Sequence, residues 1–218
     1  MSRIDDLLAA LCPDGVEFKA IGDVAEIKRG TPTTKASGIT GNIPVIAGGR
    51  TPAYFHNVSN REGQTIVIAG SGAYAGFVSW WEQPIFVSDA FSIKPKDNLL
   101  AKYCYHWLVS MQQKLHELKS GGGVPHVYPR DVATFRVPVP PLEVQRAIVT
   151  VLDAFTELEA ELEAELKAEL EARRQQYQHY RDALLSFNEH TIGTNKQAAN
   201  VRGCVRISVE IASEAESE

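Results

Sequence analysis

The most regular hydrophobic pattern in the chain lies in residues 142–187, where apolar residues recur every three or four positions. This spacing predicts one long α-helix with an apolar stripe on one face, because an α-helix turns once every 3.6 residues. With 1.5 Å of rise per residue, the helix would span roughly 65–70 Å. Between Glu157 and Leu170 it carries an acidic tetrad repeat. No small domain buries such a segment alone, so we expect a spacer that binds a partner through the stripe, whose members are Leu152, Phe155, Leu158, Leu162, Leu166, Leu170, Tyr177, Tyr180 and Leu184.

The preceding part of the chain alternates between short apolar runs and turn-forming residues. Helical spacing predicts a short helix that Pro13 ends and a longer one over residues 99–119 that Gly121 ends. Clusters of Gly, Pro, Ser and Asn separate the apolar runs that predict strands, namely 43–47, 65–69, 76–81, 85–87, 91–94 and 134–139. The pattern therefore predicts an α+β fold: a mixed α/β head in residues 1–140, a long helix in 141–188, and a poorly ordered tail in 189–218.

Charge is distributed unevenly along the 218 residues. The formal net charge is −5, but residues 1–150 carry 15 Lys and Arg against 13 Asp and Glu, whereas residues 151–190 carry 4 against 10. The acidity thus belongs to the long helix, and the slightly basic head permits DNA binding. Three distant cysteines and the lack of a long apolar run favour a soluble protein in the reducing cytoplasm.

Common catalytic signatures are missing from the sequence. It contains no Gly-x-x-x-x-Gly-Lys phosphate loop, no His-Glu-x-x-His helix and no Cys-x-x-Cys pair. Neither Asp nor Asn precedes Pro140-Pro141, so the motif of nucleotide-flipping adenine methyltransferases is absent too. Scattered histidines such as His56, His126 and His179 are expected in structural or surface roles. We therefore predict a chain that is not an enzyme and that holds no metal or cofactor of its own.

Several loops of the head carry side chains suited to nucleic acid. The segment 28–35 joins cations and hydroxyls on a turn, and the glycines of segment 70–74 allow a ligand to approach the backbone. The alternative interpretation of segment 28–35 is an ordinary solvated surface turn that binds no nucleic acid. On adjacent strand positions, Trp80 and Trp81 point to opposite faces, so we expect one in the core and leave base stacking open for the other. The residues predicted to contact DNA are Lys28, Arg29, Thr33, Lys35, Arg50, Ser71 and Tyr74.

Several separated motifs, in order, resemble the specificity subunits of type I restriction-modification systems. The resemblance covers roughly residues 10–187 and is most specific at Gly121–Asp131, which reads Gly-Gly-Gly-Val-Pro-His-Val-Tyr-Pro-Arg-Asp. The other matching segments are Cys12–Phe18, Ile21–Val24, Ile27–Gly30, Ile43–Gly49, Val137–Arg146, Ile148–Asp153 and the helical tetrads with Arg173–Phe187.

This resemblance implies a target recognition domain followed by a spacer helix. In such systems, modification subunits carry S-adenosylmethionine and methylate adenine, and ATP- and Mg-dependent restriction subunits join for cleavage. Full specificity subunits hold two recognition domains and two helices that pair antiparallel, whereas this chain has one of each. We therefore expect a homodimer joined by an antiparallel coiled coil through Leu152–Leu184, reading an interrupted palindrome. Pairing with another partial specificity subunit is the alternative.

Two other classes of function stay open from the sequence. One is a fragment of a DNA-processing enzyme, which would need a catalytic constellation that the sequence does not display. The other is a coiled-coil scaffold whose head binds protein. Activity of the isolated chain would favour the former, and a missing DNA footprint would favour the latter.

Overall fold

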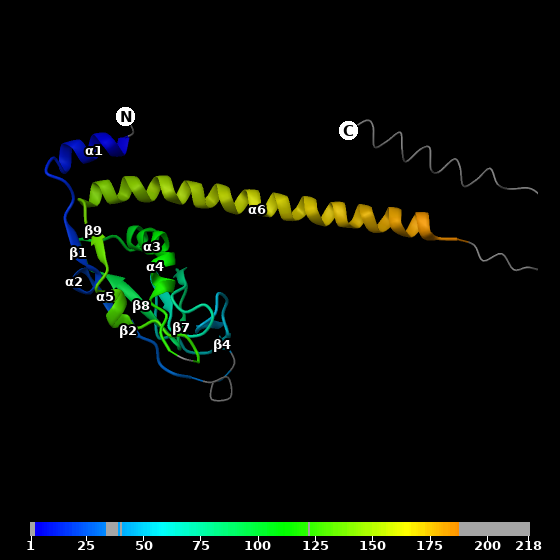
Figure 1. Cartoon of the computed structure of the whole chain (residues 1–218), viewed down its shortest axis with the longest axis horizontal. Coiled ribbons are helices and arrows are strands. Elements are labelled where there is room, and N and C mark those ends of the chain that lie inside the picture. The colour runs from blue at the N-terminus through cyan, green and yellow to red at the C-terminus, as the bar shows by residue number, and fades with distance from the viewer. Residues whose placement is uncertain (1–2, 34–38, 40, 122, 188–218) are drawn as a thin grey trace, which may run out of the picture. The chain divides into compact units, whose positions relative to one another are not determined.

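The computed structural model describes residues 3–33, 39, 41–121 and 123–187, which form an α+β head and a long helix (Figure 1). The chain divides into two compact units, residues 1–163 and 164–218. In chain order the elements are α1 (Arg3–Leu11), β1 (Phe18–Ala20), α2 (Ile21–Val24), β2 (Ala25–Arg29), β3 (Ile43–Ile46), β4 (Tyr54–His56), β5 (Thr65–Ala69), β6 (Val78–Trp81), β7 (Phe86–Val87), β8 (Ala90–Pro95), α3 (Ala101–Ser110), α4 (Gln112–Glu117), α5 (Pro129–Ala133), β9 (Arg136–Pro138) and α6 (Leu142–Leu185).

A four-stranded antiparallel sheet in the order β2-β8-β5-β6 forms the centre of the head. Every residue of β5 is buried because the strand has a core on both faces. Ile66 and Ile68 pack with α3 residues in the main core, whereas Val67 packs in a second core with Ile46 and Val87. The sequence of a central strand that is buried on both faces is a continuous apolar run, which explains why the predicted bounds 65–69 agree with those of β5.

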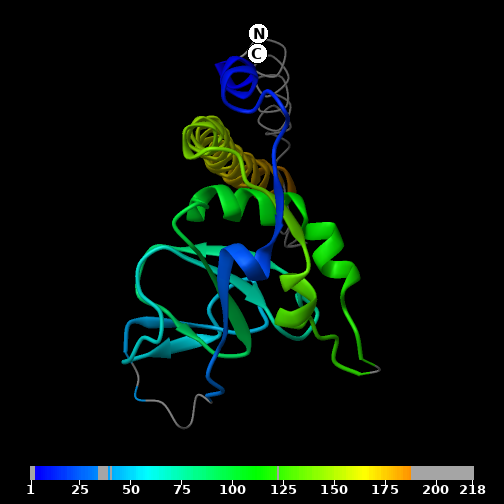
Figure 2. The ribbon, with the colours of Figure 1, turned by 90° about the vertical axis from the view of Figure 1, so that its left-hand side faces the viewer.

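Two smaller sheets complete the head. In the first, β3 pairs antiparallel with β4 and parallel with β7. In the second, β1 pairs with β9 and so joins the beginning of the head to its last strand. Figure 2 shows α3 between the central sheet and the start of α6.

The structure differs from the predicted elements in three places. Residues 25–29 form an edge strand, β2, although the sequence pattern placed Lys28 and Arg29 in a turn. The helix expected over 99–119 is two helices, because Met111 has φ −91° and ψ 8° and its N–H is shared between the carbonyls of Trp107 and Leu108. The final strand, Arg136–Pro138, is shorter than residues 134–139, since Thr134 is the C-cap of α5 and has helical backbone angles, φ −80° and ψ −12°.

The first turns of α6 are fixed to the head by one buried polar side chain. Gln145 has no exposed surface; its Oε1 accepts from the Leu100 N–H at 2.9 Å. Its Nε2 donates to the carbonyls of Asn98 at 3.0 Å and Pro140 at 2.8 Å. A buried amide with every partner supplied gives the helix one register against α3, because any shift would leave polar groups unpaired.

An ionic contact adds a second attachment two turns further along α6. Asp153 Oδ1 lies 2.7 Å from His106 Nε2 and 3.8 Å from Lys102 Nζ, both on α3. The first 22 residues of α6 therefore belong to the same packed unit as the head. The change at residue 140 is a change of secondary structure, and packing continues past it. The division into residues 1–140, 141–188 and 189–218 stays a prediction, and the tail lies outside the described residues.

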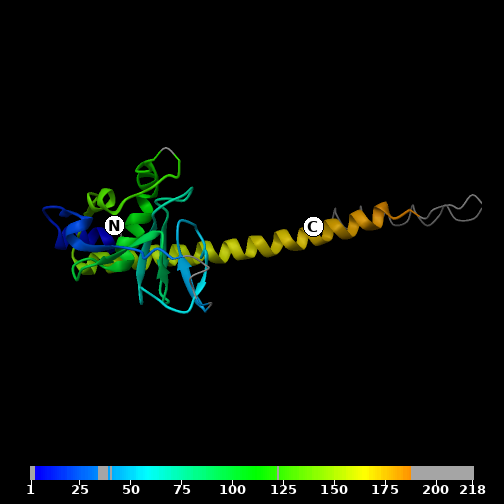
Figure 3. The same cartoon turned by 90° about the horizontal axis from the view of Figure 1, so that it is seen from below.

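Beyond Asp153 the apolar stripe of α6 faces solvent in the single chain. Phe155, Leu158, Leu162, Leu166 and Leu170 are 50–68% exposed. Figure 3 shows α6 as one continuous helix. No helix in the described part of the chain is long and apolar enough to cross a membrane.

Candidate nucleic-acid interface

Loops that are far apart in the sequence meet at the edge of the central sheet where strands β2 and β5 end and β8 begins. Arg29 pairs with Phe91 and Ala69 with Ala90, so the ends of β2 and β5 meet the start of β8. Segments 30–33, 70–74 and 88–89 therefore leave the sheet at the same edge. A later segment also reaches this edge, because the Val127 N–H donates to the Gly70 carbonyl at 3.0 Å.

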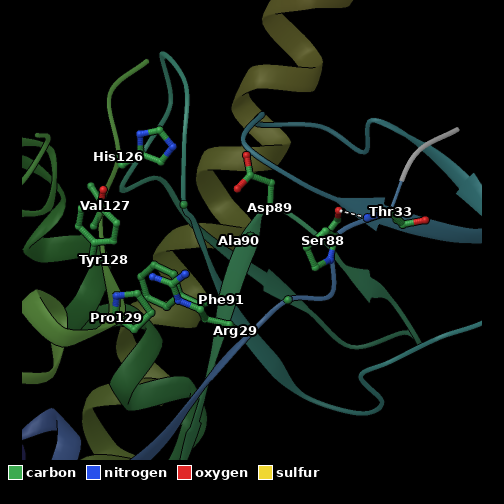
Figure 4. Close-up of a pocket in the computed structure, with 13 residues that line it drawn as sticks. Arg29, Thr33, Ser88, Asp89, Ala90, Phe91, His126, Val127, Tyr128 and Pro129 are labelled. Atoms are coloured by element: carbon green, nitrogen blue, oxygen red, sulfur yellow. Dashed lines mark hydrogen bonds between the residues drawn. The ribbon is translucent and has the colours of Figure 1, made fainter. Parts of the chain in front are cut away.

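These segments enclose a groove of ≈ 270 Å³ (Figure 4). Asp89 lies between His126 on one side and Ser88 with Thr33 on the other, and Arg29 lies beside Phe91 and Pro129. The side chains that could contact a ligand here are Arg29, Thr33, Ser88, Asp89, His126 and Tyr128.

Two glycines permit the close packing of these loops. A Cβ atom on Gly30 would lie 2.0 Å from the Ser88 carbonyl oxygen, and one on Gly48 would lie 2.4 Å from the Ser71 carbonyl oxygen. Any side chain at either position would push the loops apart. These glycines therefore set the shape of the groove and need no direct contact with a ligand.

Cationic side chains cover an aromatic ring on one wall of the groove. The guanidinium carbons of Arg29 and Arg130 lie 5.9 Å and 5.1 Å from the centre of the Tyr128 ring, and His126 stacks on the same ring at 6.0 Å. Both arginines are exposed. Such guanidinium groups can bind phosphate oxygens or the O6 and N7 atoms of guanine.

A second cation–aromatic contact lies on the neighbouring loops. The guanidinium of Arg50 is 5.1 Å from the Tyr74 ring and 5.4 Å from the Phe77 ring. Lys119 joins this region, because its ammonium group donates to the Ala73 carbonyl at 2.9 Å. The loop that carries Tyr74 is thus flanked by two positive charges, which suits a surface that follows a phosphate backbone.

Behind the groove, two side chains hold the strand ends in place. Arg61 donates through Nε to Ser92 Oγ at 2.7 Å and through a terminal nitrogen to the Arg29 carbonyl at 2.9 Å. The Asn60 side chain makes two hydrogen bonds to the backbone of Val87: its Nδ2 donates to the Val87 carbonyl at 2.8 Å, and its Oδ1 accepts from the Val87 N–H at 2.7 Å. Burial lowers the pKa of Arg61 from its ordinary value. Arg61 is therefore a structural group that positions Arg29.

The structure brings together some of the residues predicted to contact DNA and separates others. Arg29 and Thr33 line the groove, and the Ser71 hydroxyl donates to the carboxylate of Asp89 within it. Arg50 and Tyr74 contact each other nearby. Lys28 lines a different hollow, with Glu26 and Arg61, because alternate residues of β2 point to opposite faces. Lys35 lies outside the described residues.

The adjacent tryptophans Trp80 and Trp81 pack against the body of the head. Trp80 packs on the main core, with its ring 5.5 Å from Tyr105, and Lys102 Nζ lies 4.7 Å from the same ring. Trp81 packs on the second core and donates through Nε1 to Ser79 Oγ at 2.9 Å. The two rings were expected to point to opposite faces of the strand, with one of them in the core. Each face of this sheet carries a core, so both rings are packed and base stacking by either ring is not favoured.

Five residues of the site were missed among the predicted contacts: Ser88, Asp89, His126, Tyr128 and Arg130. His126 was expected in a structural or surface role, yet it lines the groove. The signal that could have found it was the alternation of aromatic and basic residues directly after the glycines at 121–123. Asp89 gave no such signal, because an isolated acid between two apolar runs is typical of a solvated turn.

With this geometry in place, comparison with known proteins defines the class. Residues 13–172 match the family described as the type I restriction modification DNA specificity domain. A putative type I restriction enzyme specificity subunit of Haemophilus influenzae is 32% identical over 203 residues, covering 88% of this chain and 52% of the relative. A type I restriction enzyme specificity subunit of Escherichia coli is 36% identical over 101 residues, or 45% of this chain and 25% of the relative.

The chain belongs to the family of type I restriction-modification specificity subunits. It spans about half the length of the Haemophilus influenzae relative and matches a quarter of the Escherichia coli one. The sequence-based resemblance is confirmed. Because the matched region runs from Pro13 to Ala172, it includes the groove and the first part of α6.

Solved structures share the fold. A type I specificity subunit from M. genitalium superposes with a TM-score of 0.60 at 21% identity, covering 80% of this chain and 47% of that one. The HsdS subunit from Thermoanaerobacter tengcongensis gives 0.53 at 21% identity, over 72% and 43% of the two chains. These likenesses confirm the predicted α+β head followed by a long helix.

Proposed function

We propose that this chain is the DNA-reading subunit of a type I restriction-modification system, with its head as the target recognition domain. The observation that carries the proposal is the groove where Arg29, Thr33, Ser71 and Tyr128 meet at one sheet edge in a member of this family. Arginines on aromatic rings supply phosphate contacts, and hydroxyl and imidazole groups supply hydrogen bonds to base edges. The chain itself is not catalytic in this proposal.

Partner subunits supply the chemistry. Modification subunits bring S-adenosylmethionine and methylate adenine, and restriction subunits bring ATP and Mg for cleavage. The chain holds no cofactor of its own and acts in the cytoplasm, where it reads double-stranded DNA. By binding one sequence, it positions the partner enzymes there.

The exposed stripe of α6 supports a homodimer. Leu158, Leu162, Leu166 and Leu170 are at least half exposed in the single chain, and monomers rarely expose so large an apolar strip. Two antiparallel copies of the helix would cover the stripe and place one head at each end. Two identical heads then read an interrupted palindrome, each copy contributing one half-site. A different partial specificity subunit could take the place of the second copy.

Methylome mapping tests the DNA-reading role. Cells expressing the chain with its modification subunit are expected to carry adenine methylation at one bipartite palindromic motif. Arg29→Ala should weaken methylation at every site roughly equally, because loss of a phosphate contact lowers affinity without changing sequence preference. Arg3→Ala, which removes a cation from α1, is the matched control. If cells that express the wild-type chain with the modification subunit show no defined methylated motif, the DNA-reading role is refuted.

Sedimentation tests the dimer. Leu162→Glu places a charge on the stripe, whereas Ala160→Glu places the same charge on an exposed position of the opposite helical face. The first change should give monomers and abolish methylation; the second should leave the dimer intact. Leu162→Pro, which also breaks the helix, should act like the first. Specific DNA binding by a wild-type monomer would contradict the arrangement.

The exposed stripe also supports a second candidate, a coiled-coil scaffold whose head binds protein. A DNA footprint obtained with and without the modification subunit separates the two. Protection of one sequence by the complex favours DNA reading, and no protection in either case favours the scaffold.

A further inference from the structure

Asp89 is unusual among the residues that line the groove. It is the only acidic residue of that lining in the described part of the chain, and its side chain is exposed. The other charged side chain of the lining belongs to Arg29, and Arg130 covers the Tyr128 ring on the same wall. A carboxylate at this place repels DNA phosphates, so its presence needs an explanation other than backbone binding.

The carboxylate is exposed but held in one position. Its Oδ2 atom accepts from the Ser71 hydroxyl, and the Asp89 carbonyl accepts from the Gly70 N–H at 3.1 Å. The preceding residue is also fixed, since the Ser88 N–H donates to the Ile46 carbonyl at 2.8 Å and Ser88 Oγ accepts from the Thr33 N–H at 3.3 Å. Such support is typical of a group that recognises a ligand with fixed geometry.

The chemistry of a carboxylate narrows what it can recognise. An ionised carboxylate only accepts hydrogen bonds, and because Oδ2 already accepts from Ser71, Oδ1 offers the greater acceptor capacity to a ligand. In the major groove, cytosine offers the N4 amino donor without a neighbouring acceptor. Adenine offers N6 beside the N7 lone pair, which repels a carboxylate, and guanine and thymine present acceptors at this place.

We propose that Asp89 reads a cytosine of the half-site through its N4 amino group. This inference rests on the proposed DNA-reading function. The residues of the groove then have separate roles, since Arg29 and Arg130 bind the phosphate backbone and Asp89 selects one base. Ser71 is a positioning residue that holds the carboxylate in its reading orientation.

Methylome mapping of Asp89 variants, each co-expressed with the modification subunit, tests the assignment. The wild-type motif should contain a fixed cytosine in each half-site. Asp89→Asn keeps the shape and the bond from Ser71 but turns a donor toward the base, so the requirement for cytosine at one position should be lost. Discrimination there should fall roughly ten- to hundred-fold, the range of one base contact. Asp14→Asn, an exposed acid in the turn after α1, is the matched control and should keep the wild-type motif.

A second measurement needs no variant protein. Replacing that cytosine by N4-methylcytosine in a short duplex removes the hydrogen that faces the major groove, so binding by the wild-type complex should weaken. Ser71→Ala should lower the preference for cytosine less than Asp89→Asn does, because the carboxylate remains but loses its support.

The outcomes separate this assignment from the proposed function. A wild-type motif without a specified cytosine, or an unchanged motif with Asp89→Asn, overturns the assignment alone. A wild-type chain that directs no methylation overturns the proposed function and the assignment with it.

Discussion

Removal of the Gln145 side-chain amide should destabilise the head measurably, although Gln145 does not line the groove. Gln145→Leu keeps a similar volume but removes three hydrogen bonds, to the Leu100 N–H and to the carbonyls of Asn98 and Pro140. A typical intramolecular hydrogen bond contributes about 1 kcal/mol net, so the loss should lower the free energy of unfolding by about 3 kcal/mol. For a unit of this size, that corresponds to a Tm lower by roughly 6–12 °C.

Differential scanning calorimetry at one fixed protein concentration measures this effect. Gln113→Leu is the control, because Gln113 is exposed on α4, where its side-chain amide donates to Glu117 at 3.3 Å. The control should melt within about 2 °C of the wild type, since exposed substitutions stay within about ±0.5 kcal/mol. If Gln145→Leu melts as the control does, water or a repacked side chain replaces the three bonds, and the reasoning about the buried amide is wrong.

Three further predictions concern groups that are buried or half-buried in the head. Arg61→Met should lower DNA affinity in a gel-shift titration because the Arg29 carbonyl loses its donor; wild-type affinity would show that β2 holds Arg29 unaided. Burial raises the pKa of Cys104 to about 12, so alkylation at about pH 8, near the ordinary pKa of a thiol, followed by mass spectrometry should modify half-buried Cys12 and spare Cys104. Burial also raises the pKa of Tyr103 to about 12. The contribution of the Tyr103 and Cys104 side chains to the free energy of unfolding is therefore complete below about pH 9 and should be lost as the pH rises toward 12. A melting temperature that stays constant between about pH 9 and pH 11 would contradict this.

The fold was predictable where one face or one strand is wholly apolar. The predicted bounds 65–69 agree with β5, and the stripe over 142–187 agrees with α6, because hydrophobic periodicity reports burial directly. Edge strand β2 was not recognised, since three of its five residues are charged and only Ala25 is buried. The break at Met111 was missed for another reason: it depends on tertiary contacts, with Gln112 bonded to Gly76 and Val78.

The candidate site was predictable only in part. The cations and hydroxyls of segment 28–35 predicted Arg29 and Thr33, and the glycines of segment 70–74 predicted Ser71, because both combinations suit DNA on any loop. Asp89 and Tyr128 were missed, since they reach the groove only through the register of β8 and the contact of residue 127 with Gly70. Such long-range partners leave no local pattern in one sequence.

The direct attachment of α6 to the head has a consequence for rotation as well as distance. A helical insertion turns everything after it by about 100° per residue. An extra tetrad after Asp153 would add about 6 Å and rotate the later stripe by about 40°, whereas about seven extra residues would add about 10.5 Å and rotate it by only about 20° in the opposite sense. If the dimer reads DNA as proposed, evolution can lengthen its unread gap most readily in steps of about seven residues, each close to about three base pairs.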